Sequence, residues 1–274
     1  MDSSEVPANV KEKIYDDLIA PAAKQIGSGI GYVGGFVSTL LCRPLHHVDL
    51  HMKAYWDKAD AEFSSKRAEI PKEQLIEPSL QLVHNAVQSL SATVTIDELR
   101  SLFINLLASA CDKRVANGVL PSFPSILQDL TPDEARLLYL FATSDANPFV
   151  EKVMLDFSEG TPIPGTTKTN LFVSTFSERA KCAHPENIPA YLDNLARLRL
   201  IEIPLGLSYS DKSLYDEIMS LEETKEWTSK KHENPNIKYD LEFKFVSLTS
   251  FGAKFCSLCG LTSGADRELF GPDF

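Results

Sequence analysis

The chain has 274 residues, of which 43% are hydrophobic and 24% are charged, a balance that suits one large or two modest globular domains. Its net charge of −11 excludes a generally basic, nucleic-acid-binding surface, because an acidic chain repels the phosphate backbone unless its positive charge is concentrated on one face. The five cysteines are odd in number and scattered, which argues against a disulfide framework and for a reducing, cytoplasmic compartment.

The N-terminal stretch begins with MDSSEVPANVKEKIYDD, in which no basic segment precedes an apolar core, so we expect no secretory signal. An uncharged run of 18 residues follows between Lys24 and Arg43. A helix that crosses a bilayer takes about 20 apolar residues. The run also contains polar residues and glycines, so we interpret it as a marginal span rather than a constitutive anchor.

The segment 26–42, IGSGIGYVGGFVSTLLC, carries Gly27, Gly31 and Gly35 at the four-residue spacing of a glycine zipper. Each glycine in a helix interior costs about 1 kcal/mol relative to alanine. Close approach of a second backbone can offset that loss, as in membrane helices and self-associating helices. Two interpretations remain open: an oligomerising, membrane-active helix, and a tight helix crossing within a soluble bundle.

The segment after Pro44 has apolar residues at three- and four-residue spacing as far as Phe63, which predicts an amphipathic helix. Tyr55 and Trp56 lie on it among basic residues, a combination that suits a bilayer interface. The same helix could instead cover the glycine segment with its apolar stripe. We therefore consider both a buried state and a released, membrane-active state.

Two further helices complete an N-terminal helical domain, which we place at residues 1–122. The first is predicted over LQLVHNAVQSL, residues 80–90. The second follows a capping box at Thr95-Ile-Asp-Glu98 and continues through DELRSLFINLLASACDKR to a stop near Asn117-Gly118. Its broad apolar face is typical of a core helix.

The second region, residues 123–274, begins with another capping box at Thr131-Pro-Asp-Glu134, which leads into the helix ARLLYLFA. The segment 157–170 has the composition of a loop. A helix that runs into a strand is predicted over 187–203, then a strand over 241–248 and a helix over 249–260. This order predicts a winged-helix-like domain with a small β-sheet and a long charged insertion at 206–240. The expected fold class is mainly α.

Few residue patterns in the chain favour catalysis. Cys256 and Cys259 form a CxxC without a second pair, so we expect both to be core residues. Asp240, Glu242 and Lys244 resemble the acidic-x-Lys strand of metal-dependent nucleases, but such a site needs a carboxylate on a neighbouring strand, and the sequence places none. We therefore interpret Glu242 and Lys244 as the solvent face of an alternating strand. We predict no enzymatic activity, no cofactor and no metal.

A nucleic-acid-binding alternative rests on four basic residues of the second region. Arg197 and Arg199 lie at the end of the expected recognition helix, and Lys230 and Lys231 lie in the wing insertion. Asp193 and Glu202 offset part of this charge. We therefore expect the winged helix to contact protein or to serve as a structural module, and the net charge argues against nucleic acid.

Several segments of the chain resemble the Abi-alpha family of bacterial abortive-infection proteins. They run in the family's order from Tyr15 to Phe255, and the most specific are LFINLLASACDK and SILQDLTPDEA. The others are YDDLIAPAAKQIGSGIG, LLCRPL, NLARLRLIE and LTSFGAKF. The resemblance implies anti-phage defence, in which the infected cell is stopped or killed before phage release. It brings no catalytic site.

These observations predict a non-enzymatic anti-phage effector that is cytoplasmic at rest. On infection, the segment 26–42 would be exposed, form homo-oligomers through Gly27, Gly31 and Gly35, and disrupt the inner membrane as a toxin, with Tyr55 and Trp56 at the interface. The alternative is a winged-helix regulator that binds nucleic acid within a defence system. The sequence does not identify the phage-derived trigger.

Overall fold

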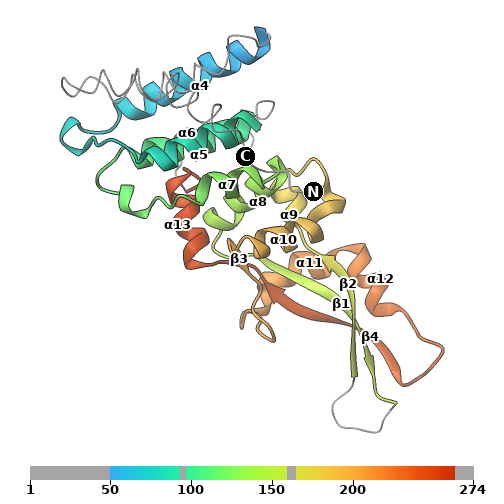
Figure 1. Cartoon of the computed structure of the whole chain (residues 1–274). Coiled ribbons are helices and arrows are strands. Elements are labelled where there is room, and N and C mark those ends of the chain that lie inside the picture. Colours follow the sequence, from blue (N-terminus) through green and yellow to red (C-terminus); the bar gives the residue numbers. More distant parts are fainter. Residues whose placement is uncertain (1–49, 93–96, 159–164, 263–274) are drawn as a thin grey trace, which may run out of the picture. The chain divides into compact units, whose positions relative to one another are not determined.

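A computed structural model describes residues 50–92, 97–158 and 165–262 of the chain (Figure 1). The chain divides into two compact units, Met1–Asp129 and Leu130–Phe274. Helices dominate the described residues, and the strands form small antiparallel sheets, which confirms the mainly α fold class. The first unit includes residues 123–129, which were predicted to belong to the second region.

The named elements of the first unit, within its described residues, are all helices. Its elements are α4 (Leu50–Ala68), η3 (Lys72–Gln74), α5 (Leu80–Ala92), α6 (Asp97–Ala110), η4 (Ala116–Gly118) and α7 (Phe123–Gln128). Helix α6 is in contact with α4, α5 and α7. Its side chains are buried on almost every face, including the polar ones of Arg100, Ser101 and Asn105. Thr95, the first residue of the predicted capping box, lies outside the described residues.

Helix α6 ends at Ala110, so the predicted stop near Asn117-Gly118 is wrong. The backbone beyond Ala110 pairs with an extended segment instead of continuing the helix. The N–H of Ile76 donates to the carbonyl of Cys111 at 2.8 Å, and the N–H of Lys113 donates to the carbonyl of Gln74 at 2.8 Å. These hydrogen bonds satisfy backbone groups that another helical turn would otherwise use.

The second unit combines helices with two small sheets. Its helices are α8 (Pro132–Thr143), α9 (Phe176–Arg179), η5 (Pro185–Asn187), α10 (Ile188–Arg197), η6 (Lys212–Tyr215), α11 (Asp216–Ser220), α12 (Glu222–Ser229) and α13 (Ser250–Leu258). Its strands are β1 (Pro148–Asp156), β2 (Gly165–Val173), β3 (Ile201–Glu202), β4 (Ile237–Phe245) and β5 (Ser247–Leu248). Helix α8 contacts α9, α10 and α13, and β3 pairs with β5.

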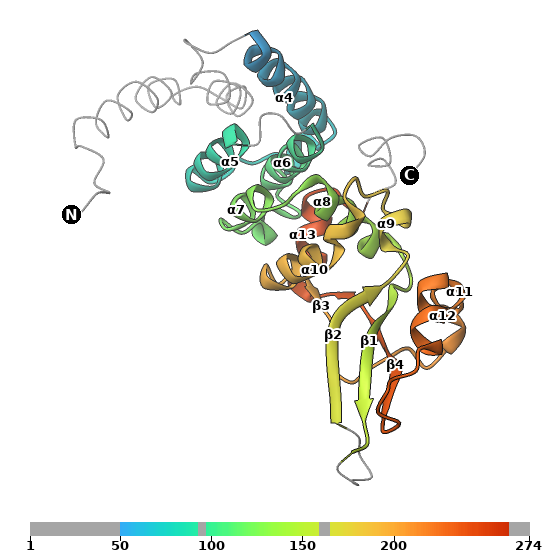
Figure 2. The same cartoon turned by 90° about the vertical axis from the view of Figure 1, so that its right-hand side faces the viewer.

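The larger sheet has the strand order β2-β1-β4, with β2 and β4 antiparallel to the central β1 (Figure 2). β1 was not predicted from the sequence, and the predicted loop over 157–170 is wrong from Gly165 onward, where β2 begins. Thr166, Thr167 and Thr169 explain the strand, because β-branched residues pack well on a pleated surface.

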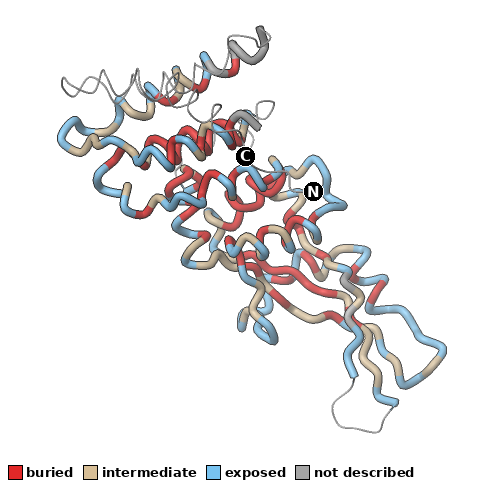
Figure 3. The backbone as a smooth tube through the Cα atoms, in the orientation of Figure 1, coloured by how far each residue is buried: buried red, intermediate tan, exposed pale blue. Residues whose placement is uncertain are grey.

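The predicted insertion at 206–240 folds into η6, α11, α12 and the first residues of β4. A hydrophobic cluster joins these helices to one face of the larger sheet. Its buried members are Val150, Val173 and Leu241 from the strands and Tyr215, Ile218 and Trp227 from the helices. Burial along β1 is greatest from Pro148 to Glu151 and declines towards Asp156 (Figure 3). The insertion is therefore an ordered layer rather than an extended wing.

Helix α13 closely approaches the backbone of Leu200, between α10 and β3, at one glycine. A Cβ atom added to Gly252 would lie 1.8 Å from the carbonyl oxygen of Leu200. The hydroxyl of Thr249 caps α13 by accepting from the N–H of Gly252 at 2.9 Å, and the same hydroxyl donates to the carbonyl of Arg199. These contacts hold α13 directly against the segment that leads into β3.

Candidate functional site

The acidic-x-Lys strand lies on β4, beside the strand that the sequence analysis missed. Glu242 is opposite Glu151 of β1 in the antiparallel register. The ammonium of Lys244 forms a buried ion pair with Glu151, and it lies 3.5 Å from the carboxylate of Glu242. The assignment of Lys244 to a solvent face is wrong, because only 5% of its surface is exposed.

Glu151 is the neighbouring carboxylate that could not be placed from the sequence, because finding it requires β1. The three side chains do not form an open metal site. Among the residues that the structure describes, there is no group of three or more His, Cys, Asp or Glu residues that could hold a metal ion. The main partner of Lys244 is a buried carboxylate, an arrangement that joins β1 to β4.

Asp240, the first residue of the pattern, is exposed and has a structural role at its backbone. Its carbonyl accepts a hydrogen bond from the indole N–H of Trp227 at 3.0 Å. Its carboxylate accepts from the N–H of Leu241 at 2.8 Å. Asp240 thus helps to attach α12 to β4.

Cys256 and Cys259 of the CxxC pattern are fully buried, as the sequence analysis predicted. Burial raises the pKa of the Cys256 thiol to about 12 and also raises that of Cys259 well above its usual value. The thiolate is the nucleophile and the metal ligand, so both residues are poorly suited to such chemistry at neutral pH. They act as small apolar residues of the core.

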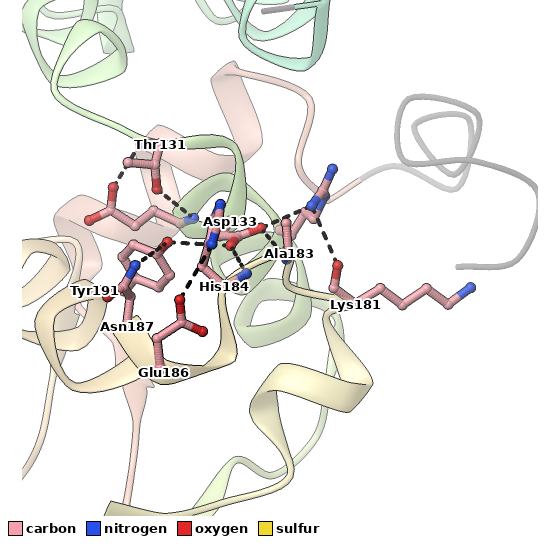
Figure 4. A network of polar contacts seen from close by, with 10 residues as sticks. Thr131, Asp133, Lys181, Ala183, His184, Glu186, Asn187 and Tyr191 are labelled. Atoms are coloured by element: carbon pink, nitrogen blue, oxygen red, sulfur yellow. Dashed lines mark hydrogen bonds and ion pairs between the residues drawn. The ribbon is translucent and has the colours of Figure 1, made fainter.

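A buried polar network centres on Asp133, at the start of α8 (Figure 4). Its carboxylate accepts hydrogen bonds from the backbone N–H groups of Ala183 and His184, each at 2.9 Å, and from the hydroxyl of Tyr191 at 3.3 Å. The guanidinium of Arg136 lies 2.9 Å away. Burial alone would raise the pKa of Asp133, but these donors and the positive charge hold it below its usual value.

The neighbouring residue, Glu134, completes the predicted capping box with Thr131. It also accepts a hydrogen bond from the side-chain amide of Asn194 on α10 at 2.6 Å. Asp133 and Glu134 therefore tie the first turn of α8 to the loop before α10 and to α10 itself. The sequence motif identified the cap but not the role of Asp133, whose donors are about 50 residues away along the chain.

A hollow of about 480 Å³ lies at the end of β2, in the second unit. Several elements line it: residues 171–174 at the end of β2, Ser177 and Glu178 of α9, Pro185 and Glu186 of η5, Ile188 and Pro189 of α10, and Leu221, Glu222 and Glu223 at the start of α12. The hollow could not be predicted from the sequence, because β2, α9, η5, α10 and α12 form it together.

The basic residues of the nucleic-acid hypothesis do not form one surface. Arg197 and Arg199 are exposed at the end of α10, next to β3. Lys230 and Lys231 are exposed after α12. The backbone of Lys231 forms an isolated antiparallel β-bridge with that of Lys238, at the start of β4. The chain is extended from Lys238 on β4 to β5, which pairs with β3. At roughly 3.3 Å per residue, this stretch spans about 30 Å. The two pairs therefore lie near opposite ends of β4.

The residues of the membrane hypothesis are only partly described. Gly27, Gly31 and Gly35 lie outside the described residues, and so does the side chain of Trp56. Tyr55 is buried within the first unit, where the guanidinium of Arg100 lies 5.3 Å from the centre of its ring. Within the described ranges, every helix is too short or too polar to cross a bilayer.

Comparisons with known proteins identify one family. Residues 51–259 match the family model described as "Abortive infection alpha". None of the curated proteins compared with the chain matches it. A solved structure of an uncharacterized protein from the hydrocarbon-degrading marine bacterium Alcanivorax borkumensis SK2 is 16% identical, with a TM-score of 0.34, over 50% of this chain and 92% of that one. That similarity is too low to carry an argument.

Proposed function

Because the chain belongs to the abortive infection alpha family, we propose that it is a non-enzymatic effector of anti-phage defence. The family description suggests a role in abortive infection. The matched residues include nearly all of the described part of the chain, and they begin at residue 51. The segment 26–42 lies before the matched residues, so its role is inferred from the sequence alone.

The ionisable side chains and thiols of the second unit that could serve catalysis are paired or buried within the protein, which supports a non-enzymatic role. Lys244 is paired with Glu151, and Asp133 is surrounded by hydrogen-bond donors. The thiols of Cys256 and Cys259 are buried, with raised pKa values. Each of these groups already serves the packing of the second unit. A metal-dependent nuclease would instead need carboxylates and a lysine that are free to reach substrate and metal.

The membrane is the proposed target, and one observation carries this step: the spacing of Gly27, Gly31 and Gly35 within 18 uncharged residues. A helix with this spacing can associate closely with a second copy of itself. In the proposed mechanism the protein is cytoplasmic at rest, and a phage-derived trigger exposes the segment. Homo-oligomers of the segment then disturb the inner membrane.

The test is inducible expression in a bacterial host, with membrane potential, growth and membrane fractionation followed with and without phage. We expect depolarisation and movement of the protein into the membrane fraction. Gly31→Leu should abolish depolarisation, because its side chain would hold two helices apart. Gly29→Leu is the matched control, since it places the same side chain in the same segment outside the four-residue spacing. Growth arrest with an intact potential and no change of fraction would contradict the proposal.

A winged-helix-like core is the second part of the proposal, and the order and contacts of the elements support it. Helices α8, α9 and α10 would form the helical core, and the β3–β5 pair would form the base of the wing. The β1–β2 hairpin then corresponds to an insertion between α8 and α9. The segment between β3 and β5 is a second insertion, and the two meet in the larger sheet.

The exposed side chains of Arg197 and Arg199 at the end of α10 favour nucleic acid as a second candidate ligand of this core. Asp193 and Glu202 are exposed nearby and argue against it. Binding through phosphate contacts would weaken steeply as salt increases. Replacement of both arginines by alanine should reduce such binding, and unchanged binding would dismiss this candidate.

A further inference from the structure

The outer edge of β2 carries backbone groups that can still form hydrogen bonds. β2 is an edge strand of the larger sheet and pairs with β1 on one side (Figure 2). In the part of the chain that the structure describes, no backbone hydrogen bond joins β2 to any segment other than β1. An edge of this kind is a template for another extended chain.

A hollow, called the groove below, lies at the end of the same strand. Residues 171–174 form one part of its lining, and the first turns of α10 and α12 contribute others. Leu171, whose side chain could contact an added strand, is 49% exposed although it is large and apolar. Because the last residues of β2 line the hollow, an extended segment that paired with β2 along its whole length would reach the hollow and cover apolar surface there.

The charge of the lining indicates which segment would fit. Four lining residues are glutamates, and none of the lining residues is lysine or arginine. The four are Glu178, Glu186, Glu222 and Glu223. Lys152 lies 3.4 Å from Glu223 and partly neutralises its charge. His184 lies 3.4 Å from Glu186 and carries a positive charge only when it is protonated. An excess of negative charge remains around the groove.

We propose that β2 and this groove bind an extended, lysine- or arginine-rich segment of a partner protein, which adds to the sheet beside β2. Main-chain hydrogen bonds to the edge supply affinity, and the glutamates select basic side chains. A second copy of this chain is disfavoured as the occupant at this edge, because two β2 edges would bring two sets of four glutamates together. The inference does not depend on the membrane step proposed above.

The first experiment measures binding of short probe peptides to the full chain by fluorescence anisotropy. The probe is a labelled nine-residue peptide of alternating lysine and valine, and a second peptide has glutamate in place of lysine. A third keeps the lysines but has N-methyl groups on alternate residues, which remove the backbone donors along one edge. We expect the first peptide to bind, the second not to bind, and the third to bind at least tenfold more weakly.

The second experiment changes the groove. The double variant Glu178→Lys/Glu222→Lys should weaken binding of the lysine peptide at least tenfold. Glu226→Lys is the matched control, because Glu226 is exposed on α12 but does not line the hollow. The affinity of this variant for the lysine peptide should stay within about twofold of that of the wild type. Circular dichroism checks the fold of each variant. An equal loss in control and double variant would overturn the proposal.

Hydrogen exchange on the unmodified chain provides a test that needs no variant. When the lysine peptide binds, the amides of residues 166–172 that do not donate to β1 should become protected from exchange. Protection elsewhere without a change on β2, or equal affinity for the N-methylated peptide, would show binding by charge alone and overturn the proposal. Absence of any binding of the lysine peptide would overturn it as well. None of these outcomes alters the expression test of the proposed function.

Discussion

Lys244 of β4 reaches diagonally across the sheet to Glu151 of β1. The register places Lys244 opposite Phe149 and Glu151 opposite Glu242. The ion pair therefore joins two positions that are not cross-strand neighbours, and both side chains are almost completely buried, at 7% and 5% exposed. Such a pair is held in place by the strands on which it lies, and removal of one partner leaves a buried charge.

We expect Lys244→Met to destabilise the second unit by about 3–5 kcal/mol, the cost typical of breaking a buried ion pair. The double variant Glu151→Leu/Lys244→Met should recover much of this loss, because it removes both charges. Urea unfolding followed by Trp227 fluorescence measures the effect, in a Trp56→Phe background where Trp227 is the only tryptophan. Equal stability of Lys244→Met and the wild type would contradict the assignment.

Asp133 provides a prediction about pH. Its pKa is held below the usual value, so its contribution to stability is complete above the pKa of the unfolded state, about 4. That contribution is lost as pH falls through the lower, folded-state pKa. Asp133→Asn should therefore cost about 2–3 kcal/mol at pH 7, since hydrogen bonds to a charged group are lost. The cost should shrink below about pH 4.

The control for this prediction is Asp193→Asn, which changes an exposed carboxyl on α10 in the same unit. We expect its free energy of unfolding to follow that of the wild type across the pH range. Urea unfolding at a series of pH values measures both variants. A cost for Asp133→Asn that does not change between pH 7 and pH 3 would contradict the role assigned to its charge.

Local signals in the sequence predicted much of the helical structure. The box at Thr131 identified the start of α8, because a cap is made by residues three positions apart. The hairpin β1–β2 was missed, since VEKVMLD does not alternate clearly and the sequence GTTKTN follows glycine and proline residues. The end of α6 was missed because its cause is pairing with residues 74–76, which no local pattern reveals.

The candidate site was harder to predict than the fold for the same reason. Glu242 and Lys244 were identified as a pattern, but they were assigned to a solvent face. That assignment was made without β1, the neighbouring strand whose Glu151 pairs with Lys244. The groove beside β2 combines residues 171–174 with residues that are up to about 50 positions away. Contacts of this range depend on tertiary packing, whereas composition and periodicity report only on local structure.

Gly252 supplies a prediction in which a better helix former should destabilise the protein. In an open helix, Gly→Ala stabilises by about 1 kcal/mol. Here the added Cβ would lie 1.8 Å from the carbonyl oxygen of Leu200, so backbone must move. We expect Gly252→Ala to cost about 2–3 kcal/mol, within the range of overpacked cores. Lys254→Ala, at an exposed position of α13, is the control and should leave the midpoint of urea unfolding nearly unchanged.

A substitution of Tyr55 can distinguish a structural role of this residue from a role at the membrane. It is 6% exposed, and Arg100, which also lies 3.3 Å from Glu62, covers its ring. Tyr55→Ala should therefore destabilise the first unit by about 3 kcal/mol, the cost of removing a buried aromatic side chain. The amides of α6 should then exchange faster with solvent, as measured by hydrogen exchange and mass spectrometry.

Asp57→Ala is the matched control for Tyr55, because Asp57 is exposed on the same helix, and it should leave exchange in α6 unchanged. If Tyr55 acted only at a bilayer, Tyr55→Ala would reduce toxicity while α6 kept its protection in solution. If Tyr55 packs against Arg100, toxicity and protection change together. Unchanged protection of α6 in Tyr55→Ala would therefore contradict the packing role and return Tyr55 to the interface hypothesis.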